Sequence, residues 1–430
     1  MIRKVLVVCI SFFLAVACVP LTPVTEATPT LTQDLNDIAT QTAAAVTTAT
    51  AFLPTATAIT ETLPAPTETT IPATTQPAQG GAQFLAYVNS EAQLLVTDVT
   101  NDVQGGTTQY TVAGESDQVM DLAWSPSGEF VAFTSVAKVD PHLFYIYALG
   151  QSTPTDLGPG SALAWSPDSQ SIAYIGGTYP DENIFVTTVE NPAPRQLTFE
   201  KNYTWGRPVF TPDGSSLVVA GTDRNNLGSS GNTKFTLETL ALDGSGTRTP
   251  LPGTQPFDGV RLPYDMQFSP DGTKLAFSTS YHLSACAAPG DYYISSADGS
   301  NQQTVVSPSL KPSIDPAQEH YQVGLSYDWT SASDGIVALG NVLDCNLSNP
   351  NPGTPIAGPQ MSIIGLDGSE RTIIPGFFYG LSIDRTGTKI AAAHHQNGFQ
   401  DPNPVVEIYS AQTGQLILSV GSGSNPQFQP

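Results

Sequence analysis

A short hairpin that recurs along the chain limits its fold more than any other feature of the sequence. Its clearest copy, Asp265–Ser280 (DMQFSPDGTKLAFSTS), has apolar residues alternating with polar ones on both sides of the turn Ser269–Gly272. Pro270 sets the backbone for the first corner of this turn, and Gly272 can adopt the positive φ that closes it. Alternating apolar residues on both sides of such a turn predict a β-hairpin.

The same unit recurs at 121–135, 162–177 and 207–222, and weaker copies occupy 326–340 and 380–394. Its second strand keeps a small residue between two larger ones, which suits a sheet packed between two neighbouring sheets. The large residues of the first strands lie 41 to 61 residues apart. They are Trp124, Trp165, Phe210, Phe268, Trp329, Ile383 and Phe428. Repeats of this length predict a propeller or an open solenoid.

The two ends of the repeat region complement each other. Residues 83–89 (QFLAYVN) match the second strand of the unit, but no first strand precedes them. Asn425–Pro430 (NPQFQP) matches a first strand, as in Arg207–Pro212 (RPVFTP). A ring in which the C-terminal strand completes the N-terminal blade explains both fragments and leaves no exposed sheet edge, whereas an open solenoid explains neither. The sequence therefore predicts an all-β, seven-bladed propeller over 83–430.

The turns at 125–128, 166–169, 211–214, 269–272 and 384–387 resemble those of TolB-type, WD40-like propeller repeats in exported bacterial proteins. This resemblance extends over residues 83–430 and implies the propeller fold. Propellers of this class serve as protein-interaction platforms, as sensor domains, as companions of peptidase domains and occasionally as enzymes. The resemblance therefore implies a fold and leaves the function open.

The first residues have the pattern of an export signal. Arg3 and Lys4 precede an apolar run, Val5–Val16, that is shorter than a membrane-spanning helix. The following Ala15–Cys18 (AVAC) resembles a bacterial lipobox, which implies cleavage after residue 17 and a diacylglycerol on Cys18. We therefore expect a lipoprotein signal peptide at 1–17 and an exported protein anchored to the cell membrane, facing outside the cytoplasm. The alternative is an ordinary signal peptide cut near Ala17.

Residues 18–82 are rich in Thr, Ala and Pro, and Phe52 is their only aromatic residue. Such a segment cannot bury enough apolar surface to offset the entropy of ordering, and its prolines favour extended conformations. The sequence predicts a disordered stalk that separates the propeller from the membrane.

The formal net charge of −23 argues against binding to nucleic acid. The motifs of several enzyme classes are also absent from the sequence: the G-x-S-x-G elbow, the P-loop and the G-x-G-x-x-G turn. We expect no cofactor, and we expect the protein to be a monomer that is not an enzyme.

Long insertions interrupt the repeat from residue 223 onward. In a blade with strands a to d, the b–c and d–a connections leave from one face, and the insertions all belong to these two kinds of connection. They are Asp223–Thr233, Pro252–Tyr264, Tyr281–Asp291, Pro308–Gln322, Asn341–Pro359 and His394–Pro404. Loops on a rigid scaffold often carry binding sites, although neutral drift in loop length is the alternative. The candidate binding residues on this face are Arg224, Arg261, Tyr264, Tyr281, His282, His320, Tyr321, His394, His395 and Phe399.

Cys286 and Cys345 are the only cysteines after Cys18, and both fall in these insertions. An exported protein favours a disulfide, so we expect a Cys286–Cys345 bridge. Two buried free thiols, or two thiolate ligands of a metal, are the alternatives.

Four histidines also fall in this region: His282, His320, His394 and His395. Their spacing matches no metal-binding motif, so we expect no metal. The favoured hypothesis is non-catalytic binding of, or scaffolding for, a protein or an envelope glycan. The alternative is a propeller hydrolase or lyase that acts on polysaccharide at this face. Convergence of at least three of the histidines near the central channel would favour the enzyme.

Overall fold

The computed structural model describes residues 82–110, 119–136, 141–147, 153–226, 234–253, 257–258, 263, 265–278, 292–346, 348, 353–398 and 401–430. All of these belong to one compact unit, Thr70–Pro430. The predicted signal peptide, Cys18 and the predicted stalk up to residue 81 lie outside the described residues. Among the residues described, no helix is long and apolar enough to cross a membrane.

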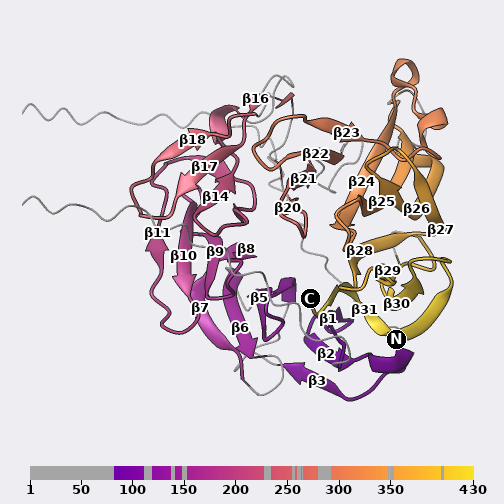
Figure 1. The fold of residues 1–430 in the computed structure, drawn as a ribbon, viewed down its shortest axis with the longest axis horizontal. Coiled ribbons are helices and arrows are strands. Elements are labelled where there is room, and N and C mark those ends of the chain that lie inside the picture. Colours follow the sequence, from indigo (N-terminus) through magenta and orange to yellow (C-terminus); the bar gives the residue numbers. More distant parts are fainter. Residues whose placement is uncertain are drawn as a thin grey trace, which may run out of the picture. The chain divides into compact units, whose positions relative to one another are not determined.

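In the described part of the chain, five separate four-stranded antiparallel sheets follow one another around a ring (Figure 1). The first contains β4 (Val119–Trp124), β5 (Phe130–Val136), β6 (Pro141–Tyr147) and β7 (Thr155–Pro159). The second contains β8 (Ser161–Trp165), β9 (Ser171–Gly176), β10 (Asn183–Thr188) and β11 (Arg195–Gln196). The third contains β13 (Val209–Phe210), β14 (Ser216–Val219), β17 (Glu238–Ala241) and β18 (Arg248–Pro250). The fourth contains β20 (Asp265–Phe268), β21 (Lys274–Ser278), β22 (Tyr292–Ser296) and β23 (Gln303–Val305). The fifth contains β24 (His320–Trp329), β25 (Gly335–Asp344), β26 (Thr354–Gly365) and β27 (Glu370–Pro375).

The remaining elements are one large sheet, two strand pairs and four short 3₁₀ turns. The large sheet has seven strands: β28 (Phe378–Ile383), β29 (Lys389–His394), β30 (Val405–Ser410), β31 (Leu416–Phe428), β1 (Phe84–Asn89), β2 (Leu94–Asp98) and β3 (Thr107–Tyr110). The pairs are β12 (Tyr203–Trp205) with β15 (Gly221–Asp223), and β16 (Lys234–Phe235) with β19 (Phe257–Asp258). The 3₁₀ turns are η1 (Thr100–Asp102), η2 (Arg224–Asn226), η3 (Lys311–Ser313) and η4 (Pro316–Gln318).

Strand β31 joins the two ends of the chain. Its first part pairs with β30 as far as Ser422, and its last part pairs with β1 from Gly423 to Phe428. The predicted pairing of the C-terminal strand with the N-terminal strand is therefore confirmed. The predicted count of seven separate blades is not: five separate four-stranded sheets are present, because β31 continues without a break and merges the remaining strands into one sheet.

The recurring hairpin is built as the sequence predicts. β20 and β21 pair in antiparallel register from Asp265–Ser278 to Phe268–Leu275. Gly272 closes the turn with φ +69°, and the backbone N–H of Thr273 donates to the Asp271 carboxylate at 3.0 Å. Burial alone would raise the pKa of Asp271, but hydrogen bonds from Ser269 and Thr273 outweigh it and lower this pKa to about 2.

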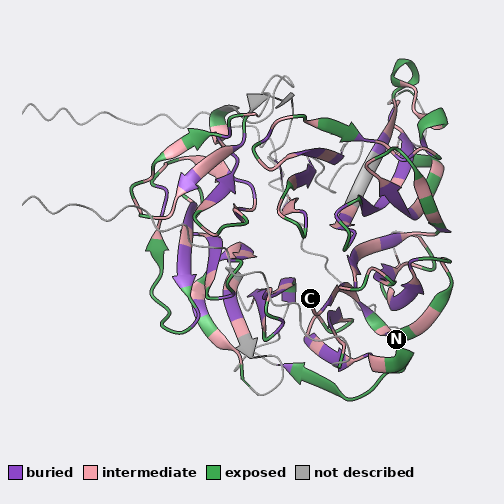
Figure 2. Cartoon of the chain, viewed as in Figure 1, coloured by how far each residue is buried: buried purple, intermediate pink, exposed green. Residues whose placement is uncertain are grey.

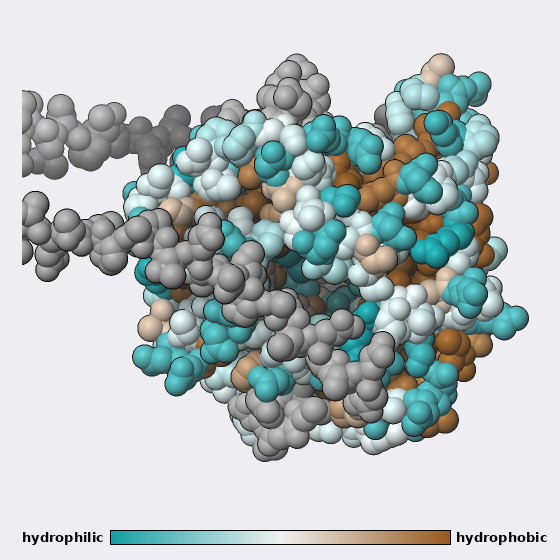
Figure 3. All heavy atoms as spheres, in the orientation of Figure 1, coloured by the Kyte–Doolittle hydropathy of each residue, from teal (hydrophilic) through white to brown (hydrophobic). Residues whose placement is uncertain are grey.

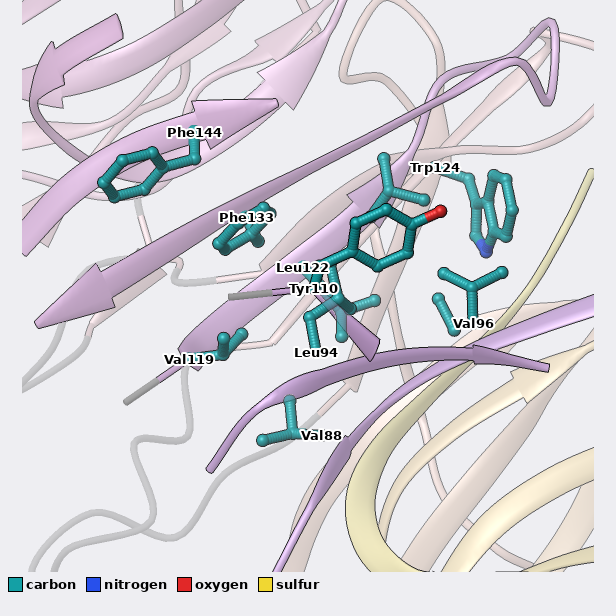
Figure 4. Packing of buried hydrophobic residues seen from close by; sticks show 11 residues of the cluster. Val88, Leu94, Val96, Tyr110, Val119, Leu122, Trp124, Phe133 and Phe144 are labelled. Carbon is teal, nitrogen blue, oxygen red and sulfur yellow. The ribbon is translucent and has the colours of Figure 1, made fainter. Parts of the chain in front are cut away.

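The hydrophobic core lies between successive sheets. Leu94 of β2, Leu122 of β4 and Phe133 of β5 pack together where the large sheet meets the first four-stranded sheet (Figure 4). The small second-strand residues Ala132 and Ala173 are 0% exposed, as expected for a sheet covered on both faces. Buried segments accordingly run through strands of the five four-stranded sheets and of the seven-stranded sheet (Figure 2).

Tryptophans of the first strands connect neighbouring sheets. Trp165 Nε1 donates to the backbone oxygen of Ala123 at 3.0 Å, and Trp329 Nε1 donates to that of Gln267 at 3.1 Å. Trp124 Nε1 donates in the same way to the backbone oxygen of Gln427 at 2.9 Å. The same kind of bond therefore links two pairs of neighbouring four-stranded sheets and also holds the C-terminal strand.

Two of the predicted loop insertions are partly strand. Gln322 belongs to β24, Asn341 to β25 and Pro359 to β26, and these strands are 10, 10 and 12 residues long. The prediction of loops at Pro308–Gln322 and Asn341–Pro359 is wrong for these parts. Val342 and Leu343 are 0% and 4% exposed, so apolar burial continues beyond the usual strand length and keeps the ladder intact.

Candidate functional site

The innermost strands of the ring enclose a polar cavity. Its wall is formed mainly by seven strands, β4, β8, β13, β20, β24, β28 and β31, and Thr134 of β5 and Ser278 of β21 also line it. Its volume is about 530 Å³. Figure 3 shows the molecule hollowed near its centre, with hydrophilic residues beside the hollow. Cavities of this size accommodate small molecules or the side chains of a partner.

The cavity lies at the end of the inner strands from which the long connections leave. Asp265 and Ser278 both line it and pair with each other across β20 and β21. Ser278 ends β21, so the connection to β22 begins there, whereas the turn Ser269–Gly272 lies at the opposite end of the same strands. Asp121 of β4 and Thr134 of β5 form an equivalent pair in the wall. The cavity and the predicted binding face are therefore on the same side of the ring.

An ion pair stands in the cavity wall beside a third charged group. Arg207, just before β13, places Nη2 2.6 Å from Oδ2 of Asp121 on β4, and the two side chains are 19% and 21% exposed. Asp265 of β20 is the third group. Burial raises the pKa of Asp265; the positive charge of Arg207 opposes this shift, and the negative charge of Asp121 adds to it. The ion pair thus lies next to a carboxyl group that retains its proton more readily than usual.

Asp328 of β24 is a fourth charged group in the wall. Its Oδ1 accepts the backbone N–H of Trp329 and its Oδ2 accepts that of Ile383, both at 2.9 Å. Burial nevertheless dominates and raises the pKa of Asp328 to about 7, and the negative charge of Asp265 adds to the effect. The side chain therefore changes its charge near neutral pH.

Sequence analysis did not single out these four residues. Asp121, Arg207 and Asp265 each stand three positions before the large residue of their strand, and Asp328 stands one position before Trp329. Odd offsets place a side chain on the opposite face of a strand from the packed large residue. The available signal was therefore a charged residue within an apolar strand, on the side away from the blade-to-blade packing.

Of the predicted site residues, His394 ends strand β29 of the large sheet, and His395 follows it directly. Nδ1 of His394 is 2.9 Å from Oε2 of Glu407, and its ring stacks on Phe378 with centroids 4.8 Å apart. The hydroxyl of Tyr409 also donates to Glu407. Burial lowers the pKa of His395, whose Nδ1 has no hydrogen-bond partner within the described part of the chain. These contacts make His394 part of a packed local network.

His320 and Tyr321 lie in strand β24 rather than in a loop. His320 pairs with Asp344 of β25, and both residues line a small polar cavity of about 290 Å³. His320 and His394 belong to different sheets and have different neighbours. Among the described histidines, His320 and His394 therefore do not converge, and His282 lies outside the described residues.

Arg224 lies near another cavity, between the first and second four-stranded sheets. This cavity has a volume of about 420 Å³, and its wall includes Tyr174, Tyr179, Glu182 and Phe185. The guanidinium of Arg224 pairs with Glu182 and lies 4.5 Å from the ring centre of Tyr179. The guanidinium of Arg224 therefore contacts two residues that line this second cavity.

The other predicted binding residues, Arg261, Tyr264, Tyr281, His282 and Phe399, lie outside the described residues. Cys345 is described and is 5% exposed, whereas Cys286 is not, so the predicted bridge stays a prediction. Within the described ranges, no three His, Cys, Asp or Glu side chains are grouped so that they could bind a metal ion.

Comparison with known proteins places the chain among β-propellers. No family model matches the sequence, and no curated protein matches it. Among solved structures, an oligogalacturonate lyase in complex with manganese has a TM-score of 0.50 and 12% identity over 78% of this chain and 83% of its own. TolB from Acinetobacter baumannii has a TM-score of 0.44 and 15% identity over 81% of this chain and 67% of its own. The likeness to the lyase shows the fold alone, and it agrees with the propeller predicted from the repeats.

Proposed function

We propose that this chain is an exported β-propeller that binds a protein or an envelope glycan without catalysing a reaction. One observation carries the proposal: a polar cavity in the inner strands lies on the side of the ring where the long connections leave. Rigid strands can hold such a cavity in place while the connections around it supply further contacts. The alternative of a polysaccharide hydrolase or lyase depends on grouped histidines. His320 and His394 have separate partners, so we propose binding instead.

Met120 provides a test of this binding face. It lines the cavity although its side chain is 63% exposed, and exposed apolar residues at a cavity rim are typical contacts of a partner. We expect Met120→Glu to reduce recovery of the partner from native membranes about tenfold or more in a pull-down with the full chain.

Leu416→Glu is the matched control, because Leu416 is 52% exposed at the start of β31, on the face of the c–d turns. Leu416→Glu should capture the partner as the unaltered protein does. Equal capture by all three proteins would show that the partner does not contact the cavity face.

We also propose that the chain is attached to the cell membrane through a lipid on Cys18 and faces outside the cytoplasm, with residues 18–82 as a stalk. The support is the AVAC sequence after an apolar run and the low aromatic content that follows. Cys18→Ala should release the protein from the membrane fraction. Retention of this variant after a high-salt wash would exclude lipid anchoring at Cys18.

A seven-bladed count is part of the proposal. The first half of β31 pairs with β30 and the second half with β1, so the seven-stranded sheet can act as two blades that share this strand. The seven strands around the cavity support this count. An experimental structure with a different number of strands around the channel would contradict it.

A further inference from the structure

We propose that the channel cavity binds a basic side chain, an ammonium or guanidinium group of a protein partner, against the carboxylate of Asp328. The inference rests on the proposed binding function and narrows the partner to a protein that inserts a cation. Its basis is the charge balance of the cavity wall together with the space that the wall encloses.

The wall already holds one guanidinium between acidic groups. Arg207 is paired with Asp121 at 2.6 Å and also acts electrostatically on Asp265. Even when Asp265 is protonated, the cavity therefore has two carboxylates, Asp121 and Asp328, for one cation once Asp328 is ionised. A second cation in the cavity would restore the balance.

Asp328 is the carboxylate left without a cation. Two backbone N–H groups, from Trp329 and Ile383, bond to it, but no Lys, Arg or His among the described residues forms an ion pair with it. A poorly solvated carboxylate favours any cation that can approach it, and the interaction gains strength because little water is present. The cavity of about 530 Å³ leaves space for a side chain to enter.

The remaining wall supports a polar cation rather than an apolar group. Ser326, Gln267, Ser278 and Asn425 offer neutral oxygen acceptors around the same space. A neutral or acidic glycan would leave the charge of Asp328 unmatched.

Acid pH should weaken this site. The titratable group that acts directly on Asp328 is Asp265 on β20. Asp328 also accepts hydrogen bonds from the backbone amides of Trp329 and Ile383 and from the side chain of Ser382. Arg207 and Asp121 act on Asp265, and Tyr327 belongs to the same wall. The raised pKa of Asp328, about 7, means that it is mostly ionised at about pH 8 and mostly protonated at about pH 6. Affinity for a cation should therefore fall about tenfold over this interval.

The four tryptophans make the test specific. The indole N–H groups of Trp124, Trp165 and Trp329 donate to backbone oxygens of the cavity residues Gln427, Ala123 and Gln267. Trp205 is the reference, because it packs against Arg248 with its ring centre 5.2 Å from that guanidinium and does not line the cavity. We would add N-acetylargininamide to the ¹⁵N-labelled protein and follow the four indole resonances by NMR, at about pH 8 and about pH 6.

The expected result is a saturable shift of the Trp124, Trp165 and Trp329 signals, with Trp205 unchanged and binding about tenfold weaker at the lower pH. N-acetylcitrullinamide has nearly the same shape without the charge and should cause no such shift. Asp328→Asn should remove the pH dependence, and Asp298→Asn, in an exposed turn, should leave it unchanged.

Equal shifts with both ligands, or no shift with either, would overturn the inference. Because these two measurements use the unaltered protein, they remain decisive if Asp328→Asn fails to fold. Partner capture without argininamide binding would retain the proposed function and reject only the cation site.

Discussion

Phe428→Ala will lower the free energy of unfolding by about 3–5 kcal/mol, the usual cost of removing a buried phenylalanine ring. Phe428 is 4% exposed, pairs with Leu85 of β1 and packs against Val406 and Ile408 of β30. The cavity left by its ring would therefore lie at the point where the C-terminal strand closes the ring of sheets. Denaturation followed by intrinsic fluorescence measures the change.

Leu416→Ala is the control for this experiment, since Leu416 belongs to the same strand but is 52% exposed. We expect its effect to stay within about 0.5–1 kcal/mol, as for most surface substitutions. If both variants lost the same stability, the closure by β31 would not depend on burial of Phe428.

Arg207→Met is expected to cost about 3 kcal/mol at neutral pH and less in acid. Removing one partner from a poorly solvated ion pair leaves uncompensated charge, here on Asp121 and Asp265. Without the opposing positive charge, the pKa of Asp265 should rise further. Its carboxyl group would then be protonated in the folded protein over a wider pH range, so the loss decreases as the pH falls. Unfolding curves at several pH values measure both effects.

Asp121→Asn provides the comparison, because Arg207 then still faces Asp265. It should cost less than Arg207→Met and should not raise the pKa of Asp265. A loss in Arg207→Met that is constant from acid to neutral pH would show that Arg207 acts through packing rather than through its charge.

The sequence was sufficient for the parts of the fold that depend on local rules. The hairpin at Asp265–Ser280 combines alternation with a turn that requires Gly272 at positive φ, and both leave a clear pattern. The closure by β31 was also predictable, because a first strand at the end of the chain complements a second strand at its start. In each case the pattern of the segments involved is enough for the prediction.

Other features depend on distant contacts and could not be predicted in this way. The length of β31 depends on its two neighbours, β30 and β1, which pair with its first and its last part. This length in turn determines how many separate blades are counted. The start of β24 and the end of β25 fall in segments that were predicted as loops, although Val342 and Leu343 are buried there.

The charged groups of the cavity show the same limit. Asp121 and Arg207 are 86 positions apart, and only the ring brings β4 and the strand after Arg207 to the same wall. The histidines and aromatic residues attracted attention because they lie in long insertions. His394 instead contacts Glu407 within its own sheet, and Arg224 contacts Glu182. Residue type in a loop was a weaker guide than the position of a charge along an inner strand.

The closure by β31 also determines when the protein can first become functional during its synthesis. β31 follows all other strands in the chain, and its partner β1 precedes them, so the sheet around β1 stays open until β31 has emerged. Until then the ladder edge of β1 is available to other chains, and the wall of the channel lacks one of its strands. The chain would thus complete its channel cavity in a single late step, and a product interrupted before β31 would carry most of the sequence but an incomplete cavity wall.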